Sequence, residues 1–359
     1  MNKVKVAIIG CGGIATGKHL PSLSKIEQVE IIGFFDVFSE SAHKAAEKFG
    51  SPGAKVYENY RELLADPAID VVHICTPNDS HAEISIAALE AGKHVMCEKP
   101  MAKTAADARR MVEVAKRTGK KLTIGYNNRF RADSQHLKRV VEDGDLGEIY
   151  FAKAHAIRRR GVPTWGVFLD EEKQGGGPLI DIGTHALDLT LWLMNNYEPK
   201  VVLGTAYHKL SRKENAANSW GPWDPAKFKV EDSAFAMIVM KNGATIMVEA
   251  SWALNTLDTK EAKTTLCGTE GGADMVDGLR INGEKHSRLY VNQLQFEAKG
   301  ADFYEGKKES MQDKEIRMWI ESVIHDREPI VTPEQSLVVS EILEAIYESN
   351  RTGKAVYFD

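Results

Sequence analysis

Residues 4–15 read Val-Lys-Val-Ala-Ile-Ile-Gly-Cys-Gly-Gly-Ile-Ala, a short apolar run that ends in a glycine-rich turn. The β-branched run is typical of a buried parallel strand. The turn is the alanine variant of the G-x-G-x-x-G dinucleotide fingerprint, in which the first glycine allows the tight turn and the second leaves room for a pyrophosphate. The helix that follows offers its N-terminal amides to the phosphates. The predicted cofactor-binding residues in this turn are Gly10, Gly12, Gly13, Ile14 and Ala15.

Strand and helix patterns alternate through the first 126 residues, which predicts a doubly wound parallel sheet. After the glycine-rich turn, we expect a helix to about residue 26. Strands are predicted over 4–9, 29–35, 55–57, 70–75, 94–99 and 121–126. Further helices are predicted over 39–49, 60–65, 82–91 and 104–118, the last with Thr104 as its N-terminal cap.

Asp36 ends the second predicted strand, 26 residues after Gly10. A carboxylate near this offset can accept hydrogen bonds from the adenosine ribose and would repel a 2′-phosphate. The position therefore predicts NAD in preference to NADP as the cofactor. The alternative is an aspartate that only caps a turn or a helix.

Two further segments follow strands at the carboxyl edge of the predicted sheet, where open parallel sheets bind ligands. Pro100 cannot donate to a strand ladder, so the fifth strand should stop at Lys99. A lysine there is a candidate for catalysis, although a solvated lysine at a strand end is the alternative. The segment after the fourth strand supplies the predicted cofactor contacts Thr76, Pro77, Asn78 and His81, of which the histidine is alternatively a plain helix-start residue.

The pattern changes after Tyr126, where strands predominate and an α+β region with an open, mostly antiparallel sheet is expected. Strands are predicted over 148–159, 201–210, 233–253 with a hairpin turn at Lys241-Asn242-Gly243, 263–267, 273–276 and 288–291. Helices are predicted over 132–143, 309–325 and 333–350. Residues 211–229 are expected to form a long surface loop, as a lid or an oligomer contact. The expected domains are residues 1–126 for NAD(P) binding and 127–359 for substrate binding and oligomerisation.

A second candidate site lies at residues 175–188, Gly-Gly-Gly-Pro-Leu-Ile-Asp-Ile-Gly-Thr-His-Ala-Leu-Asp. The three glycines predict a flexible entry to a helix, and Pro178 suits its first turn. Asp181 and His185 are four residues apart and so share one helix face, where the carboxylate can orient the imidazole. An inert surface pair and a metal pair are alternatives, but no third ligand stands at a recognisable spacing, so no metal is predicted.

The composition excludes several classes of function. The 359 residues suffice for two domains, with 43% hydrophobic and 27% charged residues. The net charge of −5 gives no basic excess for nucleic acid or a membrane surface, and no apolar run approaches the ~18 residues of a spanning helix. The N-terminal apolar part is too short for a signal peptide. The four cysteines form no C-x-x-C pair, so we expect reduced, buried thiols in a cytoplasmic protein.

Three motifs in this order, the glycine-rich turn, Glu98-Lys99-Pro100 and Gly175-Gly176-Gly177 with Asp181 and His185, resemble those of the Gfo/Idh/MocA oxidoreductases. The resemblance covers essentially the whole chain. It implies that Lys99 and the Asp181–His185 pair meet over the nicotinamide, and that the second domain uses its open sheet in a homo-oligomer, a dimer or a tetramer.

The resemblance also implies roles for single residues. Lys99 would polarise or help deprotonate the reacting hydroxyl, His185 would be the general acid/base, and Asp181 its partner at the substrate. Glu98 and Asn78 would line the cofactor pocket. At the position of Asn128 the family often has an arginine, so whether Asn128 contacts the nicotinamide side of the cofactor stays open. Substrate contacts are expected from Lys99, Tyr126, Arg158, Trp165, Asp181 and His185, although Arg158-Arg159-Arg160 is equally well a solvated strand end.

The implied reaction is reversible hydride transfer between nicotinamide and a secondary hydroxyl or ketone of a sugar, polyol or cyclitol. Positioned acid–base groups contribute about 10²–10⁴-fold to such reactions. Two alternatives stay open on the same scaffold, a redox-assisted glycosidase that recycles its NAD and a non-catalytic sugar or nucleotide sensor. A sensor needs neither Lys99 nor His185.

Overall fold

A computed structural model describes residues 3–296 and 309–359. In this described part of the chain, contacts between residues define two compact units. The first unit comprises Met1–Asn127 and Glu309–Leu337, and the second comprises Asn128–Lys308 and Val338–Asp359. The segment 309–337 thus packs with the first unit, although the sequence places it with the second domain. The domain limits themselves stay a prediction.

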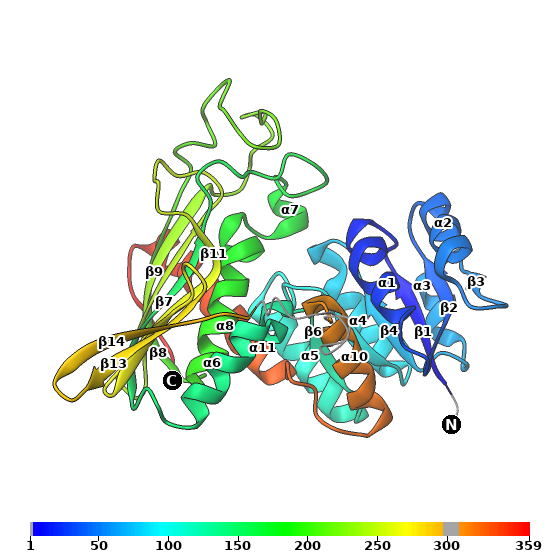
Figure 1. The fold of residues 1–359 in the computed structure, drawn as a ribbon. Coiled ribbons are helices and arrows are strands. Elements are labelled where there is room, and N and C mark those ends of the chain that lie inside the picture. Colours follow the sequence, from blue (N-terminus) through cyan, green and yellow to red (C-terminus); the bar gives the residue numbers. More distant parts are fainter. Residues whose placement is uncertain (1–2, 297–308) are drawn as a thin grey trace. The chain divides into compact units, whose positions relative to one another are not determined.

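The described residues of the first unit contain a parallel sheet of six strands in the order β3-β2-β1-β4-β5-β6, which confirms the predicted doubly wound fold (Figure 1). The order reverses between β1 and β4, which is the switch point where such sheets bind ligands at their carboxyl edge. The strands are β1 (Val4–Ile9), β2 (Val29–Phe35), β3 (Lys55–Val56), β4 (Val71–Ile74), β5 (His94–Cys97) and β6 (Leu122–Ile124).

Helices flank this sheet where their apolar faces can be buried. They are α1 (Leu20–Leu23), α2 (Ser39–Phe49), α3 (Tyr60–Ala65), α4 (His81–Glu90), α5 (Ala105–Thr118) and α10 (Met311–Ile324). Thr104 caps α5 as predicted, because its hydroxyl accepts the N–H of Asp107 at 3.1 Å. Ile316, Trp319 and Ile320 of α10 pack into the core made by β1, α1 and β2, which explains why this distant helix belongs to the first unit.

The described residues of the second unit form a sheet of nine strands in the order β14-β13-β12-β11-β7-β10-β9-β8-β15. Only β7 and β10 are paired in parallel among these strands, so the sheet is mostly antiparallel, as predicted. The strands are β7 (Ile149–Ile157), β8 (Pro199–Tyr207), β9 (Ser233–Met240), β10 (Thr245–Ser251), β11 (Lys260–Gly268), β12 (Gly271–Asp274), β13 (Leu279–Lys285), β14 (Arg288–Leu294) and β15 (Val356–Tyr357). The hairpin turn at Lys241–Gly243 is present, but β13 was not predicted, because its residues are largely polar.

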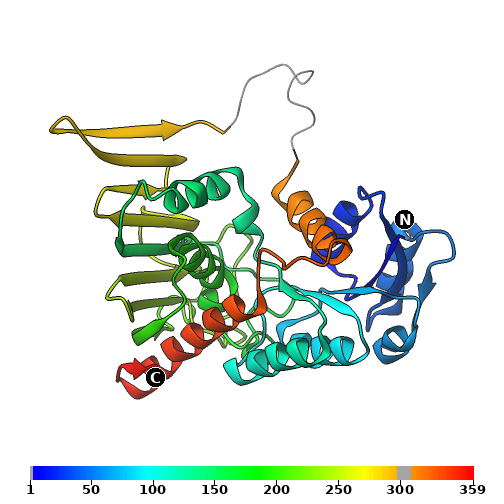
Figure 2. The same cartoon turned by 90° about the horizontal axis from the view of Figure 1, so that it is seen from below.

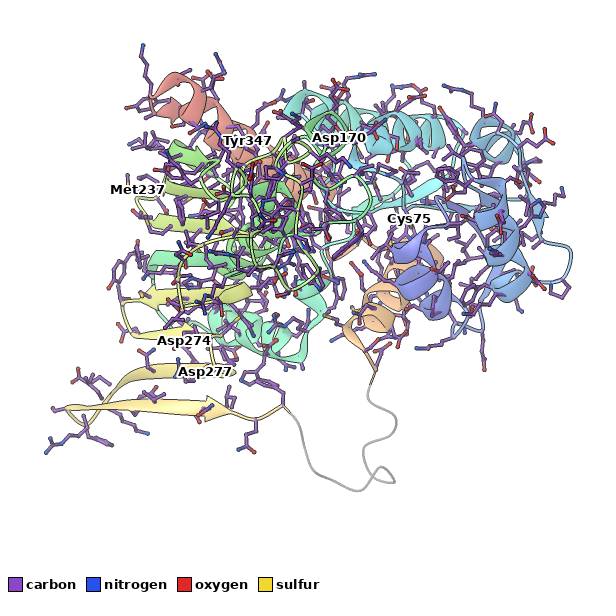
Figure 3. The ribbon with its side chains drawn as sticks, turned by 90° about the horizontal axis from the view of Figure 1, so that it is seen from above. Cys75, Asp170, Met237, Asp274, Asp277 and Tyr347 are labelled. Carbon is purple, nitrogen blue, oxygen red and sulfur yellow. The ribbon has the colours of Figure 1, made fainter. Side chains whose placement is uncertain are left out.

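Helix α8 (Thr184–Met194) lies along one face of this sheet against β7 and β11, and α6 (Ala132–Glu142) packs on α8 (Figures 1 and 2). Two further helices of the described residues are α7 (Glu171–Gln174) and α11 (Pro333–Thr352). The opposite face carries exposed apolar side chains that alternate with buried neighbours, among them Met237, which Figure 3 labels, and its cross-strand partners Leu203 and Met247. We call this surface the open face of the sheet.

Residues 211–229 form no regular element, as predicted, but they are only partly a surface loop. Trp223 and Phe228 are buried, and the Trp223 indole donates to the carbonyl oxygen of Ser211 at 3.0 Å. All four cysteines are free thiols, and Cys267 is half-buried where the others are buried. Within 3–296 and 309–359, no helix combines the length and apolarity needed to cross a membrane.

Candidate active site

The glycine-rich turn sits at the carboxyl end of β1, where the backbone at Cys75 packs directly against Gly10. Gly10 has φ +88°, and a Cβ there would lie 2.7 Å from the Cys75 carbonyl group, so only glycine fits. A Cβ at Gly12 or Gly13 would meet no described atom within 4 Å. The turn is therefore closed toward the sheet and open on the side where a pyrophosphate would lie, which fits a dinucleotide.

The Asp36 carboxylate is fixed beside this turn. One oxygen accepts the N–H of Cys11 at 2.7 Å, and the other accepts the N–H of Phe38 at 2.8 Å. Val37 and Phe38, which follow, are strongly exposed and carry no charge. Each carboxylate oxygen has a second lone pair, so the group can hold a ribose diol while offering nothing to a 2′-phosphate.

The segment after β4 begins a short 3₁₀-helix at Asn78–Ser80 and then α4. The Ser80 hydroxyl donates to the Thr76 hydroxyl at 2.7 Å. His81 is buried, with Nδ1 2.7 Å from the Pro100 carbonyl oxygen and Nε2 2.9 Å from the Thr76 carbonyl oxygen. Because both ring nitrogens contact protein oxygens, the structure favours a bracing role for His81 over the direct cofactor contact that the sequence predicts.

Glu98 lies in a buried charged network that the sequence analysis missed. Its Oε1 accepts from Lys18 Nζ at 2.6 Å and from His19 Nε2 at 2.8 Å. Its Oε2 lies 3.2 Å from the N–H of Lys99. Burial opposes the charge on Glu98, but Lys18 and His19 hold the pKa of this carboxyl well below its usual value. The carboxylate therefore anchors the backbone of the candidate catalytic lysine and has little surface left for a cofactor.

The network continues to α10 and β4. Lys18 Nζ also lies 2.8 Å from Glu315 Oε2, and His19 Nδ1 lies 2.8 Å from His73 Nδ1. Burial lowers the pKa of both histidines, which favours their neutral forms. With His19 Nε2–H donating to Glu98, His73 must donate through Nδ1–H, which leaves its Nε2 as a lone pair without a partner among the described residues. The available sequence signal for this buried network was the adjacent Lys18 and His19 in the predicted helix after the glycine-rich turn.

Replacing Lys18 by methionine should lower the free energy of unfolding by about 3–5 kcal/mol, because two buried carboxylates would lose their shared cation. Urea denaturation followed by circular dichroism measures the loss. The matched control is Lys25→Met, whose exposed pair with Asp313 should contribute less than about 1 kcal/mol. Equal losses in the two variants would contradict the interpretation of the network.

Lys99 follows β5 and is half-buried, and its peptide bond to Pro100 is cis. The strand ends at Cys97, two residues before the predicted end at Lys99, so Glu98 and Lys99 both lie just beyond the carboxyl edge of the sheet. Gly125, just after β6, packs against Glu98, since a Cβ there would approach both carboxylate oxygens to 3.0 Å. The backbone at Lys99 is thus set by contacts from three neighbouring segments.

In the second unit, Asp181 and His185 stand out on an otherwise buried helix. A π-helical turn at Leu179–Gly183 runs directly into α8. Within the described stretch 176–193, every residue is buried except Asp181 and His185, which are half-buried. π-helical turns occur frequently at functional sites. An inert surface pair would sit on a solvated helix face, so this arrangement favours a functional pair.

The helix start is held by Glu231, a buried carboxylate that the sequence analysis did not single out. Its oxygens accept the N–H groups of Gly177 at 2.8 Å and Leu179 at 3.1 Å, and the hydroxyl of Tyr347 at 2.9 Å. Burial raises the pKa of Glu231 to about 7, against these hydrogen bonds.

The predicted flexibility of this glycine segment is wrong for Gly176 and Gly177. A Cβ on Gly176 would lie 2.1 Å from the Tyr347 hydroxyl, and one on Gly177 would lie 2.3 Å from the Glu231 carbonyl oxygen. Both residues are buried. These glycines allow close packing instead of movement.

Trp252, just after β10, donates its indole N–H to Asp181 Oδ2 at 3.1 Å. Edge-to-face ring contacts lead from Trp252 through Phe168 and Trp165 to Trp220. Trp165, a predicted substrate contact, is 52% exposed and Trp220 is 46% exposed, whereas Trp252 is buried. An aromatic path therefore connects the Asp181 carboxylate with an exposed pair of tryptophans. Trp252 was missed because it ends a long apolar run.

Two other predicted contacts are buried. Tyr126 and Asn128 are each less than a tenth exposed, so the structure gives their predicted substrate and cofactor roles no support. Beside them, the buried Arg129 pairs with Asp188 of α8 through Nε–Oδ2 and Nη2–Oδ1 contacts of 2.9 and 2.5 Å. The described residues contain no group of three or more histidine, cysteine, aspartate or glutamate side chains placed to hold a metal ion.

Two models of known protein families match the chain. A family model described as an oxidoreductase family with an NAD-binding Rossmann fold matches residues 4–126, and the C-terminal alpha/beta domain of the same family matches residues 138–358. The chain belongs to the Gfo/Idh/MocA oxidoreductase family. It is accordingly an oxidoreductase whose first unit carries an NAD-binding Rossmann domain.

Relatives within the Gfo/Idh/MocA family include the D-glucoside 3-dehydrogenase of Escherichia coli (strain K12). That protein is 36% identical over 353 residues, which cover 98% of this chain and 97% of the relative. The myo-inositol 2-dehydrogenase of Thermotoga maritima is 32% identical over 191 residues, which cover 53% of this chain and 55% of the relative.

Solved structures of similar fold cover nearly the whole chain. The aldose-aldose oxidoreductase from Caulobacter crescentus, complexed with glycerol, superposes with a TM-score of 0.79 at 26% identity, covering 99% of this chain and all of that one. Levoglucosan dehydrogenase, in complex with NADH and levoglucosan, has a TM-score of 0.82 at 23% identity, covering 99% of both chains, and shows the shared fold.

Proposed function

We propose that this Gfo/Idh/MocA protein is an NAD-dependent dehydrogenase that transfers a hydride between nicotinamide and a secondary hydroxyl or ketone of a sugar, polyol or cyclitol. The observation that carries the proposal is the exposure of Asp181 and His185 alone on a buried helix. The glucoside and inositol dehydrogenases among the relatives support the substrate class.

The residues of the first unit that would hold the cofactor are the Gly10–Ala15 turn, Asp36 and the Thr76–Asn78 segment. Bound NAD would supply the hydride chemistry. The turn would bind the pyrophosphate through backbone N–H groups, and Asp36 would accept the ribose hydroxyls. Buried side chains position these segments through hydrogen bonds and ion pairs. They are His81, Glu98 and the Lys18–His19 pair.

Each proposed catalytic residue acts on the reacting hydroxyl. The Lys99 ammonium stabilises the alkoxide that develops on the substrate oxygen. His185 accepts the hydroxyl proton as the electron pair of the C–H bond leaves as hydride, and returns it in the reverse direction. Asp181, itself fixed by the Trp252 indole, orients the substrate and the imidazole.

The proposal is tested by incubating the purified chain with NAD or NADP and a panel of sugars, polyols and cyclitols, and following absorbance at the reduced nicotinamide band. Net reduction of NAD by one substrate class is expected. Glycoside cleavage without net reduction would indicate the redox-assisted glycosidase instead. Tight binding without either reaction would indicate a sensor.

Asp36→Ala should weaken NAD binding roughly ten- to a hundredfold. It should also reduce the difference between the dissociation constants of NAD and NADP. A charge-assisted hydrogen bond contributes about 1.5–3 kcal/mol, and the repulsion of a 2′-phosphate would disappear with the carboxylate. Dissociation constants of both cofactors for the wild type and the variant measure the effect. A control for cofactor-independent damage is Asp145→Ala, on an exposed turn of the second unit. Equal affinities in the wild type would show that Asp36 does not select the cofactor.

We also propose a cytoplasmic homo-oligomer that uses the open face of the second unit. Leu203, Met237 and Met247 are 46%, 41% and 39% exposed there, which is unusual for side chains of this size on three adjacent strands. Light scattering of the purified chain measures its oligomeric state directly.

A further inference from the structure

A pocket of about 400 Å³ lies in the second unit where the chain leaves β7. This volume is within the range of small-molecule sites. Its lining includes four cationic side chains and a tryptophan, Arg158, Arg159, Arg160, Lys260 and Trp220, together with one carboxylate, Glu261. Such a concentration of arginine around one pocket favours an anionic ligand.

The positive charge of the pocket is only partly neutralised. Arg158 forms a two-point pair with Glu261, with Nε–Oε2 and Nη2–Oε1 contacts of 2.6 and 2.5 Å, and its guanidinium lies 5.3 Å from the centre of the Trp220 ring. Lys260 pairs with Asp258 at 2.9 Å. In each of these two ion pairs, the carboxylate neutralises the charge of its cationic partner.

Among the residues that the structure describes, Arg159 and Arg160 have no carboxylate partner. Arg160 donates only to neutral oxygens, including the Asn255 side chain at 2.5 Å and the Leu254 carbonyl at 3.1 Å. The Arg159 side chain is exposed and makes no hydrogen bond or ion pair with any residue of the described chain, although the Arg159 carbonyl oxygen accepts from the N–H of Leu254 at 3.0 Å and from Arg160 Nη1 at 2.6 Å. Two positive charges therefore face the pocket without a carboxylate to balance them.

The arginine segment that lines the pocket is linked through backbone hydrogen bonds to the tryptophan that contacts Asp181. The N–H of Arg158 donates to Ser251 and that of Gly161 to Trp252, so the arginine segment runs beside the tryptophan that bonds Asp181. Burial opposes the charge of Arg158, but Glu261 and, more weakly, Asp181 raise the pKa of its guanidinium. A substrate placed at Asp181 can thus extend into this pocket.

We propose that the pocket is a subsite for an anionic group of the substrate, a carboxylate or a phosphate carried away from the carbon that is oxidised. Arg159 and Arg160 bind the anion, and the half-exposed face of Trp220 packs on the carbon skeleton next to it. This inference rests on the proposed function, because it names the kind of sugar that the dehydrogenase prefers.

The test compares kcat/KM for D-glucose with that for D-glucuronate and D-glucose 6-phosphate, which separates a carboxylate from a phosphate. At least one anionic sugar should exceed the neutral one tenfold or more, with the advantage decreasing as salt is added. Arg159→Gln should reduce this anionic-to-neutral ratio by about 10–100-fold. Arg139→Gln, on an exposed position of α6, makes the same charge change away from the pocket and should leave the ratio unaltered.

A ratio near one for both anions in the wild type, or an equal ratio in Arg159→Gln, would overturn the subsite. Failure of the proposed function gives a different result, namely no reduction of NAD by any of the sugars. In that case, calorimetric titration of the same sugars into the full chain decides the subsite. Binding of an anionic sugar that Arg159→Gln loses would support it, and equal or absent binding of both anions would overturn it.

Discussion

Lys99→Met should lower kcat by about 10²–10⁴-fold while leaving the fold intact. The variant keeps the length and packing of the stem but removes the ammonium that would stabilise the developing alkoxide. Methionine makes no ion pair, so a neutral alcohol would have to release its hydride without a cation at its oxygen. Steady-state kinetics with saturating NAD and the substrate found in the panel measure the loss.

The controls for Lys99→Met separate catalysis from structure. Lys44→Met removes a lysine of α2 that is 72% exposed and that, among the described residues, pairs with Glu40 one turn away, so turnover of this variant should match the wild type. NADH binding, followed by nicotinamide fluorescence, should change less than about threefold in either variant. Turnover of Lys99→Met near the wild-type value would refute the catalytic assignment.

His185→Ala should also lower kcat by about 10²–10⁴-fold at neutral pH, because no group would then accept the hydroxyl proton as the hydride leaves. The difference in kcat between His185→Ala and the wild type should decrease as the pH rises, since hydroxide can take over the role of the base. The measurement is the pH profile of kcat for the wild type and the variant between about pH 6 and 10.

His43→Ala is the matched control for this experiment. His43 is an exposed histidine of α2, away from the predicted site residues, and its removal should alter neither kcat nor the shape of the profile. A loss in His185→Ala no greater than in His43→Ala, or a deficit independent of pH, would make the Asp181–His185 pair structural.

Much of the first unit was predictable because its information is local. The β-branched runs and the glycine and proline positions fixed β1, β2, α2 and α3 to the residue or nearly so. The positive φ of Gly10 follows from a single glycine, and Pro100 placed the end of β5 to within two residues of its observed end at Cys97. The four-residue spacing of Asp181 and His185 likewise showed that the two side chains share a helix face.

Long-range contacts were beyond prediction from sequence. The pairing of Lys18 with Glu98 and Glu315 joins residues up to 297 positions apart, as 315 − 18 gives. No local pattern shows that α10 packs on β1, or that Trp252 bonds Asp181. The polar strand β13 forms because its neighbours β12 and β14 satisfy its backbone, which its own composition does not disclose.

The sequence by itself therefore determined the Rossmann order of the first unit, the family to which the motifs point, and the identity of the candidate acid–base residues. Periodicity and turn chemistry act over a few residues and can be recognised without the fold. The tertiary structure alone showed that Glu98 is buried in a charged network and that both ring nitrogens of the buried His81 contact carbonyl oxygens. It alone showed that Gly176 and Gly177 are packed, and that the Arg159 side chain lines a pocket without a carboxylate partner among the described residues. These properties depend on burial and on partners distant in the chain, which exist only once the chain has folded.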